Sequence, residues 1–181
     1  DWLEFVPKAH NREVVILPDD QSGLVTFEAG LDGAFSGTFT AEVSYRGQTL
    51  GRAEVRANAA RTAAQVRVEE PRLWMPGAPE LYDVAYTLRT EDGAEDRVQA
   101  YFGFRRSEIE GSAFRINGRK VFQRLVLDQG FYPDGIYTAP TDEALRRDIE
   151  LSMEAGFNGA RLHQKVFEER FLYWADRLGY L

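Results

Sequence analysis

The sequence predicts an immunoglobulin-like β-sandwich over residues 1–105, followed by the first βα units of a (β/α)8 barrel over residues 106–181. Two observations predict this order. Before residue 105, about seven short runs of apolar or alternating residues are separated by turn residues. After it, an apolar strand, a helix with a capping residue, a second apolar strand and a second helix follow one another, as at the start of a parallel barrel.

The composition is that of a globular protein with a real core. Hydrophobic residues make up 44% of the chain, and 12 Phe, 8 Tyr and 3 Trp are available to fill an interior. The net charge of −7 argues against nucleic-acid and acidic-membrane partners, which need a basic patch. No run approaches the roughly 20 apolar residues of a membrane span. The absence of cysteine excludes disulfides and thiolate chemistry, and it is compatible with a reducing cytosol and also with export.

The expected sandwich strands are apolar, rich in β-branched residues or alternating in polarity. They cover residues 14–17, 24–29, 38–45, 64–68, 82–88 and 97–102. The last two pair across the hairpin turn signal Glu91-Asp92-Gly93. Residues 73–82 are rich in aromatic and proline residues. We expect them to form an aromatic plug where two sandwich strands are bridged, the alternative being a platform on which a sugar stacks.

The second part opens with a hairpin and a strand. Asn117-Gly118 is the strongest two-residue hairpin signal, and it joins residues 113–116 to residues 120–122. The apolar strand 123–127 comes next.

Two helices flank the second apolar strand, residues 159–163. Thr141 is a good N-cap for the first helix, whose apolar face carries Leu145, Ile149 and Met153. Gly156 follows as its C′ residue, and the second helix covers residues 167–178.

Polar residues stand at or just past the ends of the two barrel strands. Asp128 and Gln129 follow the first strand, and Arg161 and His163 occupy alternate positions at the end of the second. Because the carboxyl ends of parallel strands meet at one rim, we expect Asp128, Arg161 and His163 to converge there. Carboxylate, amide, guanidinium and imidazole groups can together bind sugar hydroxyls. The alternatives remain open: a loop acid with a turn glycine, an Arg161 paired with a buried acid, and a His163 that is an ordinary satisfied polar residue.

Metal chemistry is not expected. The two histidines, His10 and His163, are far apart in sequence and no cysteine accompanies them, so the sequence predicts no metal and no cofactor. The adjacent acidic pairs are expected on the solvated surface, because neighbouring residues of a strand or helix point apart. They are Asp19-Asp20, Glu69-Glu70, Glu91-Asp92 and Glu168-Glu169.

Several motifs in the right order resemble glycoside hydrolase family 2, the family of β-galactosidases, β-glucuronidases and β-mannosidases. The segments that carry the resemblance are Leu73–Tyr82, Tyr101–Arg105, Phe114–Phe122, Ala155–His163 and Phe171–Gly179. Trp2-Leu3-Glu4 also resembles the closing strand of the family's preceding sugar-binding domain. In the strand 123–127 and its exit the chain departs from the family, because Asp128-Gln129 replaces the usual polar pair and no His follows.

The resemblance implies a parent enzyme that is a retaining glycosidase acting on O-glycosidic bonds of a carbohydrate substrate. Its acid/base and nucleophile Glu residues would lie on later barrel strands, so we expect these 181 residues alone to be inactive. Arg161 matches the family Arg that orients the surroundings of the nucleophile, and His163 matches a substrate-contacting His. Asp128 and Gln129 match by position only.

Two other classes of protein are kept open, a non-catalytic carbohydrate-binding module and a protein-interaction module. A sandwich Trp exposed for sugar stacking would favour the first, and a buried Trp74 favours the segment of an enzyme. Unpaired barrel strands are further expected to cause homo-oligomerisation or poor order in the C-terminal part.

Overall fold

The structure is a computed structural model that describes residues 3–33 and 36–181. Trp2, the first residue of the segment likened above to a closing strand, lies outside the described residues. The chain divides into two compact units. The first unit ends at Phe104 and excludes Leu73–Glu80, and the second combines Leu73–Glu80 with Arg105–Leu181.

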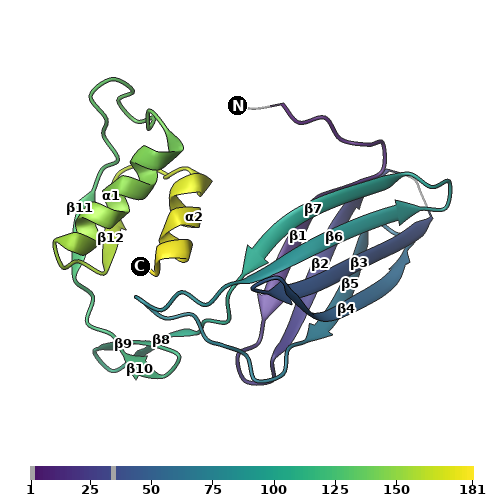
Figure 1. Cartoon of the computed structure of the whole chain (residues 1–181), viewed down its shortest axis with the longest axis horizontal. Helices are drawn as coiled ribbons and strands as arrows, with labels where there is room; N and C mark the ends of the chain where they lie inside the picture. The colour runs from purple at the N-terminus through teal and green to yellow at the C-terminus, as the bar shows by residue number, and fades with distance from the viewer. Residues whose placement is uncertain (1–2, 34–35) are drawn as a thin grey trace. The chain divides into compact units, whose positions relative to one another are not determined.

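The first unit is a β-sandwich of two antiparallel sheets, which confirms the predicted sandwich (Figure 1). One sheet has the order β1-β2-β5 and the other the order β4-β3-β6-β7. The strands are β1 (His10–Pro18), β2 (Leu24–Asp32), β3 (Gly37–Tyr45), β4 (Gln48–Ala57), β5 (Arg61–Arg67), β6 (Tyr82–Thr90) and β7 (Glu95–Phe102). Alternate residues of β2, β3 and β6 point between the sheets and are almost fully buried, because successive side chains of a strand face opposite sides.

Strand β4 was not predicted, although it spans ten residues. Its inward positions carry Gly51, Ala53, Val55 and Ala57, so its alternation lacks the large apolar residues that signal a strand. Packing explains the glycine, because a Cβ atom on Gly51 would lie 2.7 Å from Cγ1 of Val66 on β5. The tight approach of β4 to β5 thus depends on a residue that weakens the sequence signal.

The first strands of the second unit form the three-stranded meander β8 (Ser107–Glu110), β9 (Ala113–Ile116) and β10 (Arg119–Lys120). The predicted hairpin is confirmed, since β9 pairs with β10. Asn117 and Gly118 have φ values of +51° and +73°, as a two-residue turn of type I′ requires. Strand β8 was not predicted, because all four of its residues are exposed and only one is apolar.

A strand–helix–strand–helix series completes the second unit (Figure 1). Its elements are β11 (Leu125–Asp128), α1 (Asp142–Glu154), β12 (Gly159–Leu162) and α2 (Glu169–Leu178). The predicted caps are confirmed: the Thr141 hydroxyl accepts a hydrogen bond from the Ala144 amide, and Gly156 has a φ of +92°. Buried residues of both helices and of the chain around α2 form one core. They are Leu145, Ile149, Phe167, Phe171, Ala175 and Tyr180.

The plug predicted for residues 73–82 is corrected by the structure, because Leu73–Glu80 packs within the second unit instead of bridging sandwich strands. Trp74 is 2% exposed, and its indole N–H donates a hydrogen bond to the Asp176 carbonyl oxygen at 2.8 Å. The Arg105 guanidinium lies 4.6 Å from the centre of the Trp74 ring. Trp74 is therefore a core side chain and not a sugar platform.

Candidate functional site

Strands β11 and β12 lie side by side and run parallel, in the register Leu125↔Gly159 to Asp128↔Leu162. Just beyond this ladder, the His163 amide donates a hydrogen bond to the Asp128 carbonyl oxygen at 2.8 Å. The carboxyl ends of both strands therefore meet at one edge, as parallel pairing requires. This backbone bond fixes the distance between the starts of the two following loops.

Gln129 and His163, which are 34 positions apart in the chain, meet at this edge. Nε2 of Gln129 lies 3.2 Å from Nδ1 of His163. Because an amide NH2 group can only donate, this contact is a hydrogen bond in the tautomer that accepts at Nδ1 and carries its proton on Nε2. Gln129 is exposed and His163 is half-buried, so the pair offers a ligand an imidazole N–H donor and an amide oxygen acceptor.

Arg161 lies opposite Leu127 in the parallel ladder, and both side chains are exposed. Two positions further along the chain is His163, so Arg161 and His163 face the same side of the strand pair. The structure records no hydrogen bond or ion pair between the Arg161 side chain and any described residue. The alternative in which Arg161 pairs with a buried acid is therefore not seen among residues 3–33 and 36–181.

Asp128 reaches the same edge, but its side chain serves its own loop. Its carboxylate accepts a hydrogen bond from the Gly130 amide at 2.7 Å, the geometry of an Asx turn. Alternation along β11 points Asp128 to the side opposite Leu127. The pKa values of two tyrosines agree with this direction. Burial raises the pKa of Tyr132, followed by its hydrogen bond to Asp148 and then by the negative charge of Asp128; burial also raises the pKa of Tyr180, and the charge of Asp128 adds to that rise.

The structure thus brings together a different set of side chains from Asp128, Arg161 and His163, the three that were expected to converge. Gln129 and His163 are in contact, Arg161 faces the same side, and the Asp128 carboxylate orders the turn behind them. Sequence reasoning assigned Asp128 to the rim from its place after the apolar run and did not apply the alternation that it applied to Arg161 and His163.

Lys165 is a site residue that sequence reasoning missed. Its ammonium group donates hydrogen bonds to the carbonyl oxygens of Gly130, at 3.1 Å, and Tyr137, at 2.9 Å. The same group lies 4.7 Å from the centre of the Phe167 ring, a cation–π distance. A single lysine in a loop gives no sequence signal for such contacts, because its partners are carbonyl groups about 30 positions away.

Cofactor and membrane features can be stated for the part of the chain that the structure describes. No three side chains of His, Cys, Asp and Glu are grouped there as a metal site would need. None of its helices combines the length and the apolar character needed to cross a bilayer.

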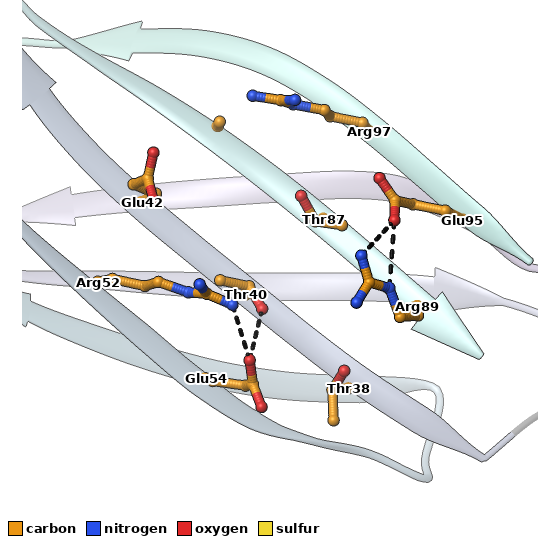
Figure 2. A pocket seen from close by; sticks show the side chains of 10 residues that line it. Thr38, Thr40, Glu42, Arg52, Glu54, Thr87, Arg89, Glu95 and Arg97 are labelled. Atoms are coloured by element: carbon orange, nitrogen blue, oxygen red, sulfur yellow. Dashed lines mark hydrogen bonds and ion pairs between the residues drawn. The ribbon is translucent and has the colours of Figure 1, made fainter. Parts of the chain in front are cut away.

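A polar hollow of about 220 Å³ lies on the outer face of the four-stranded sheet of the first unit (Figure 2). The central strands β3 and β6 contribute short side chains, Thr40 and Thr87 among them, and all four strands contribute long charged side chains. Two Arg–Glu pairs neutralise much of this charge: Arg52 with Glu54 at 2.9 Å and Arg89 with Glu95 at 2.7 Å. The first pair lies along β4 and the second joins β6 to β7, as is usual on a solvated sheet face, so the strand-end cluster is the stronger candidate for function.

Polar side chains at the carboxyl edge of a parallel strand pair occupy the position at which parallel barrels carry their active sites. The family model described as "Glycosyl hydrolases family 2" matches residues 12–105, more than half of the chain. The chain therefore belongs to glycosyl hydrolase family 2, which confirms the family resemblance drawn from its motifs.

Individual relatives are glycosidases. The chain is 34% identical over 186 residues to beta-mannosidase B of Neosartorya fischeri, covering 93% of this chain and 22% of that protein. It is 30% identical over 117 residues to a beta-galactosidase of Lactococcus lactis, covering 64% of this chain and 12% of that protein. The chain thus spans about a fifth, 22%, or less of the length of these relatives.

Solved structures show the same fold. The crystal structure of a Parabacteroides merdae beta-glucuronidase superposes with a TM-score of 0.87 at 19% identity, covering 97% of this chain and 23% of the other. A Bacteroides uniformis beta-glucuronidase gives a TM-score of 0.82 at 23% identity. At this level of identity the likeness concerns the fold alone.

Proposed function

We propose that these residues are part of a retaining glycoside hydrolase that cleaves O-glycosidic bonds of a β-galactoside, β-glucuronide or β-mannoside type of substrate. The observation that carries the proposal is the parallel pairing of β11 and β12, which brings Gln129 and His163 into contact and turns Arg161 to the same side, in a chain of family 2. Carbohydrate-active relatives of the chain support the substrate class.

The fold assigned in the proposal is an immunoglobulin-like sandwich over residues 1–105 and the N-terminal part of a (β/α)8 barrel over residues 106–181. Two contacts support a continuing parallel sheet. The Leu181 amide donates to the Asn158 carbonyl oxygen at 3.0 Å, and the Ala160 amide donates to the Leu181 carbonyl oxygen at 2.8 Å. This is the bonding pattern of a parallel bridge on the edge of β12 that β11 leaves open.

The proposed roles follow from the donors and acceptors at the strand ends. His163 donates from Nε2 to a sugar hydroxyl, while Gln129 fixes the ring tautomer through Nδ1. Arg161 supplies a permanent positive charge that orients a carboxylate of the catalytic centre. Asp128 acts on the site indirectly. Its carboxylate accepts from the Gly130 amide, and this turn fixes the backbone conformation of Gln129 and Gly130.

A retaining mechanism needs two carboxyl groups about 5–5.5 Å apart, one as nucleophile and one as acid/base. Asp128, the acid at the strand ends, is held by the Gly130 amide and does not supply such a pair. We therefore propose that these 181 residues bind part of the sugar but do not hydrolyse it alone. The catalytic pair would come from a continuing barrel.

The test compares two polypeptides on chromogenic β-galactoside, β-glucuronide and β-mannoside substrates. One is this chain, and the other, called the extended polypeptide, is this chain continued by the remaining length of a family 2 glycosidase. We expect hydrolysis by the extended polypeptide, with the β-anomer as the first product in NMR spectra, and no turnover by this chain. First formation of the α-anomer would overturn the retaining mechanism, and turnover by this chain would overturn its inactivity.

A further inference from the structure

The Gln129–His163 contact depends on two loops that the strand ladder fixes only at their starts. Gln129 begins the long loop between β11 and α1, and His163 begins the short loop between β12 and α2. The last backbone bond of the ladder joins His163 to Asp128. Beyond it, each loop can move by itself unless a further contact joins the two.

Lys165 supplies that contact. It lies on the short loop, two residues after His163, and its ammonium group bonds two carbonyl oxygens of the long loop. One of them belongs to Gly130, the neighbour of Gln129, and the other to Tyr137, seven residues further on. A charged donor makes the stronger class of hydrogen bond, and Lys165 is a half-buried residue whose bond to the Gly130 carbonyl oxygen is itself partly buried.

Gly130 is shaped to receive this lysine. Its φ of +57° is a left-handed conformation that glycine adopts without strain. A Cβ atom at this position would lie 2.7 Å from Nζ of Lys165 and 3.0 Å from Cε1 of Phe167. The loop backbone therefore approaches the ammonium group as closely as only a glycine permits, and Phe167 supports the ammonium from the ring side at 4.7 Å.

We infer that Lys165 is a positioning residue of the strand-end site: its ammonium group clamps the loop after β11 to the loop after β12 and so keeps Gln129 against His163. The inference rests on the proposed function in one respect, because the clamped pair is the one assigned to bind a sugar. The clamp itself is a statement about this chain and can be tested without a substrate.

The test uses side-chain NMR of this chain, in which His163 and His10 are the two histidines. In the unmodified chain we expect an NOE between the Gln129 side-chain amide and the His163 ring, and the 15N shift of an accepting Nδ1. Lys165→Met keeps the apolar stem on Phe167 and removes the donors, so we expect both signals of His163 to be lost. Lys165→Arg keeps charge and donors, and we expect it to retain them.

Two controls distinguish the loss of the Lys165 contacts from a general loss of structure. Lys120→Met removes the ammonium of the exposed lysine of β10 and should leave His163 unchanged. His10, whose Nδ1 lies 3.0 Å from the Pro7 carbonyl oxygen in the first unit, should keep its signals in every variant. His163 signals that persist in Lys165→Met would overturn the clamp. So would a loss of the His163 signals that Lys120→Met reproduces.

Kinetics of the extended polypeptide separate the two proposals. With Lys165→Met we expect kcat/KM to fall roughly tenfold or more, because a displaced binding group lowers the rate even at a distance from the reacting bond. An unmodified extended polypeptide without glycosidase activity would overturn the proposed function, and the NMR result would still decide the clamp. Unchanged kcat/KM in Lys165→Met would overturn its positioning role in the site.

Discussion

At the scale of single residues, the contacts of Trp74 explain why Leu73–Glu80 belongs to the second unit. The indole is buried, donates to the Asp176 carbonyl oxygen at the end of α2, and stacks under the Arg105 guanidinium. The Trp74 carbonyl oxygen in turn accepts a hydrogen bond from the Asn117 side chain at 2.9 Å. Trp74 thus joins the helical part of the second unit to its hairpin.

Replacing Trp74 tests this role. We expect Trp74→Ala to lower the free energy of unfolding of the second unit by about 3–5 kcal/mol, the usual cost of removing a large buried aromatic side chain. Trp74→Phe keeps a ring but leaves the Asp176 carbonyl without its donor, which costs about 1–3 kcal/mol. Urea unfolding followed by circular dichroism measures both. Equal stability of the two variants and the unmodified chain would contradict the assignment.

Several residue roles were predictable because they depend on local chemistry. Thr141 caps α1 through its own hydroxyl, and Asn117-Gly118 forms its turn from its own backbone preferences. The direction of the Asp128 carboxylate was also within reach of local reasoning, from strand alternation and from its turn with Gly130. The contacts of Lys165 depend on carbonyl groups of a distant loop. No local pattern carries that information, so the role of Lys165 appears only in the folded chain.

At the scale of elements, hydrophobic alternation was sufficient for the strands with large inward side chains and failed for the others. Strands β2, β3 and β6 carry Phe, Val, Leu and Tyr at inward positions, and each was predicted. Strand β4 packs closely on β5 through Gly51, and β8 is fully exposed, so neither shows the alternation on which the prediction depends. Packing against neighbours, which a single strand's sequence does not state, decides such elements.

Asp96 on β7 joins the two sheets of the sandwich. Its carboxylate accepts hydrogen bonds from the backbone amide and the side-chain amide of Asn11 on β1, each at 2.8 Å. We expect Asp96→Ala to lower the free energy of unfolding of the first unit by about 1–3 kcal/mol, since both donors lose their acceptor. Glu69→Ala, which removes an exposed carboxylate, is the matched control. If chemical denaturation shows that Asp96→Ala destabilises the first unit no more than Glu69→Ala does, this interpretation is wrong.

Asp142, at the start of α1, ties this helix to α2. It accepts hydrogen bonds from Arg170 Nε at 2.5 Å and from the Trp174 indole at 2.9 Å. The bond with Arg170, followed by the bond with Trp174, holds the pKa of Asp142 below its usual value of about 3.9.

The sign of the resulting pH dependence follows from this depression. The stabilisation is fully present above the unfolded pKa of about 3.9, and it is lost as the pH falls through the lower pKa of the folded state. We therefore expect Asp142→Asn to flatten the loss of stability of the second unit below about pH 4. Asp134→Asn, which replaces an exposed loop carboxylate, is the control. In a series of thermal-unfolding measurements at different pH values, it should leave the loss of stability at acid pH (the acid limb) unchanged. Identical acid limbs for Asp142→Asn and the unmodified chain would count against the helix tie.

At the scale of the whole molecule, the surface of the second unit is the informative feature. Apolar side chains of the second unit are open to solvent: Leu127 on β11 is 53% exposed and Phe131 in the following loop is 64% exposed. In a complete parallel barrel the strand side that carries Leu127 would face the interior. The proposed barrel accounts for this exposure.

Self-association of this chain is the corresponding prediction. An open strand edge beside exposed apolar side chains favours pairing between copies. We expect light scattering to give a mass above the 20.6 kDa of the monomer at high concentration. Leu127→Lys should shift the mass towards the monomer, whereas Val98→Lys on β7 should not. A concentration-independent monomeric mass for the unmodified chain would refute it.

The central claim is that the edge at which β11 and β12 end is the sugar-binding part of a glycosidase site. The most direct measurement is kcat/KM of the extended polypeptide on its preferred chromogenic glycoside, with His163→Ala compared with His10→Ala. We predict a fall of roughly fivefold or more for His163→Ala, since a hydrogen bond to substrate is worth about 1 kcal/mol or more, and no change for His10→Ala. Equal kcat/KM values for the two variants would contradict the account.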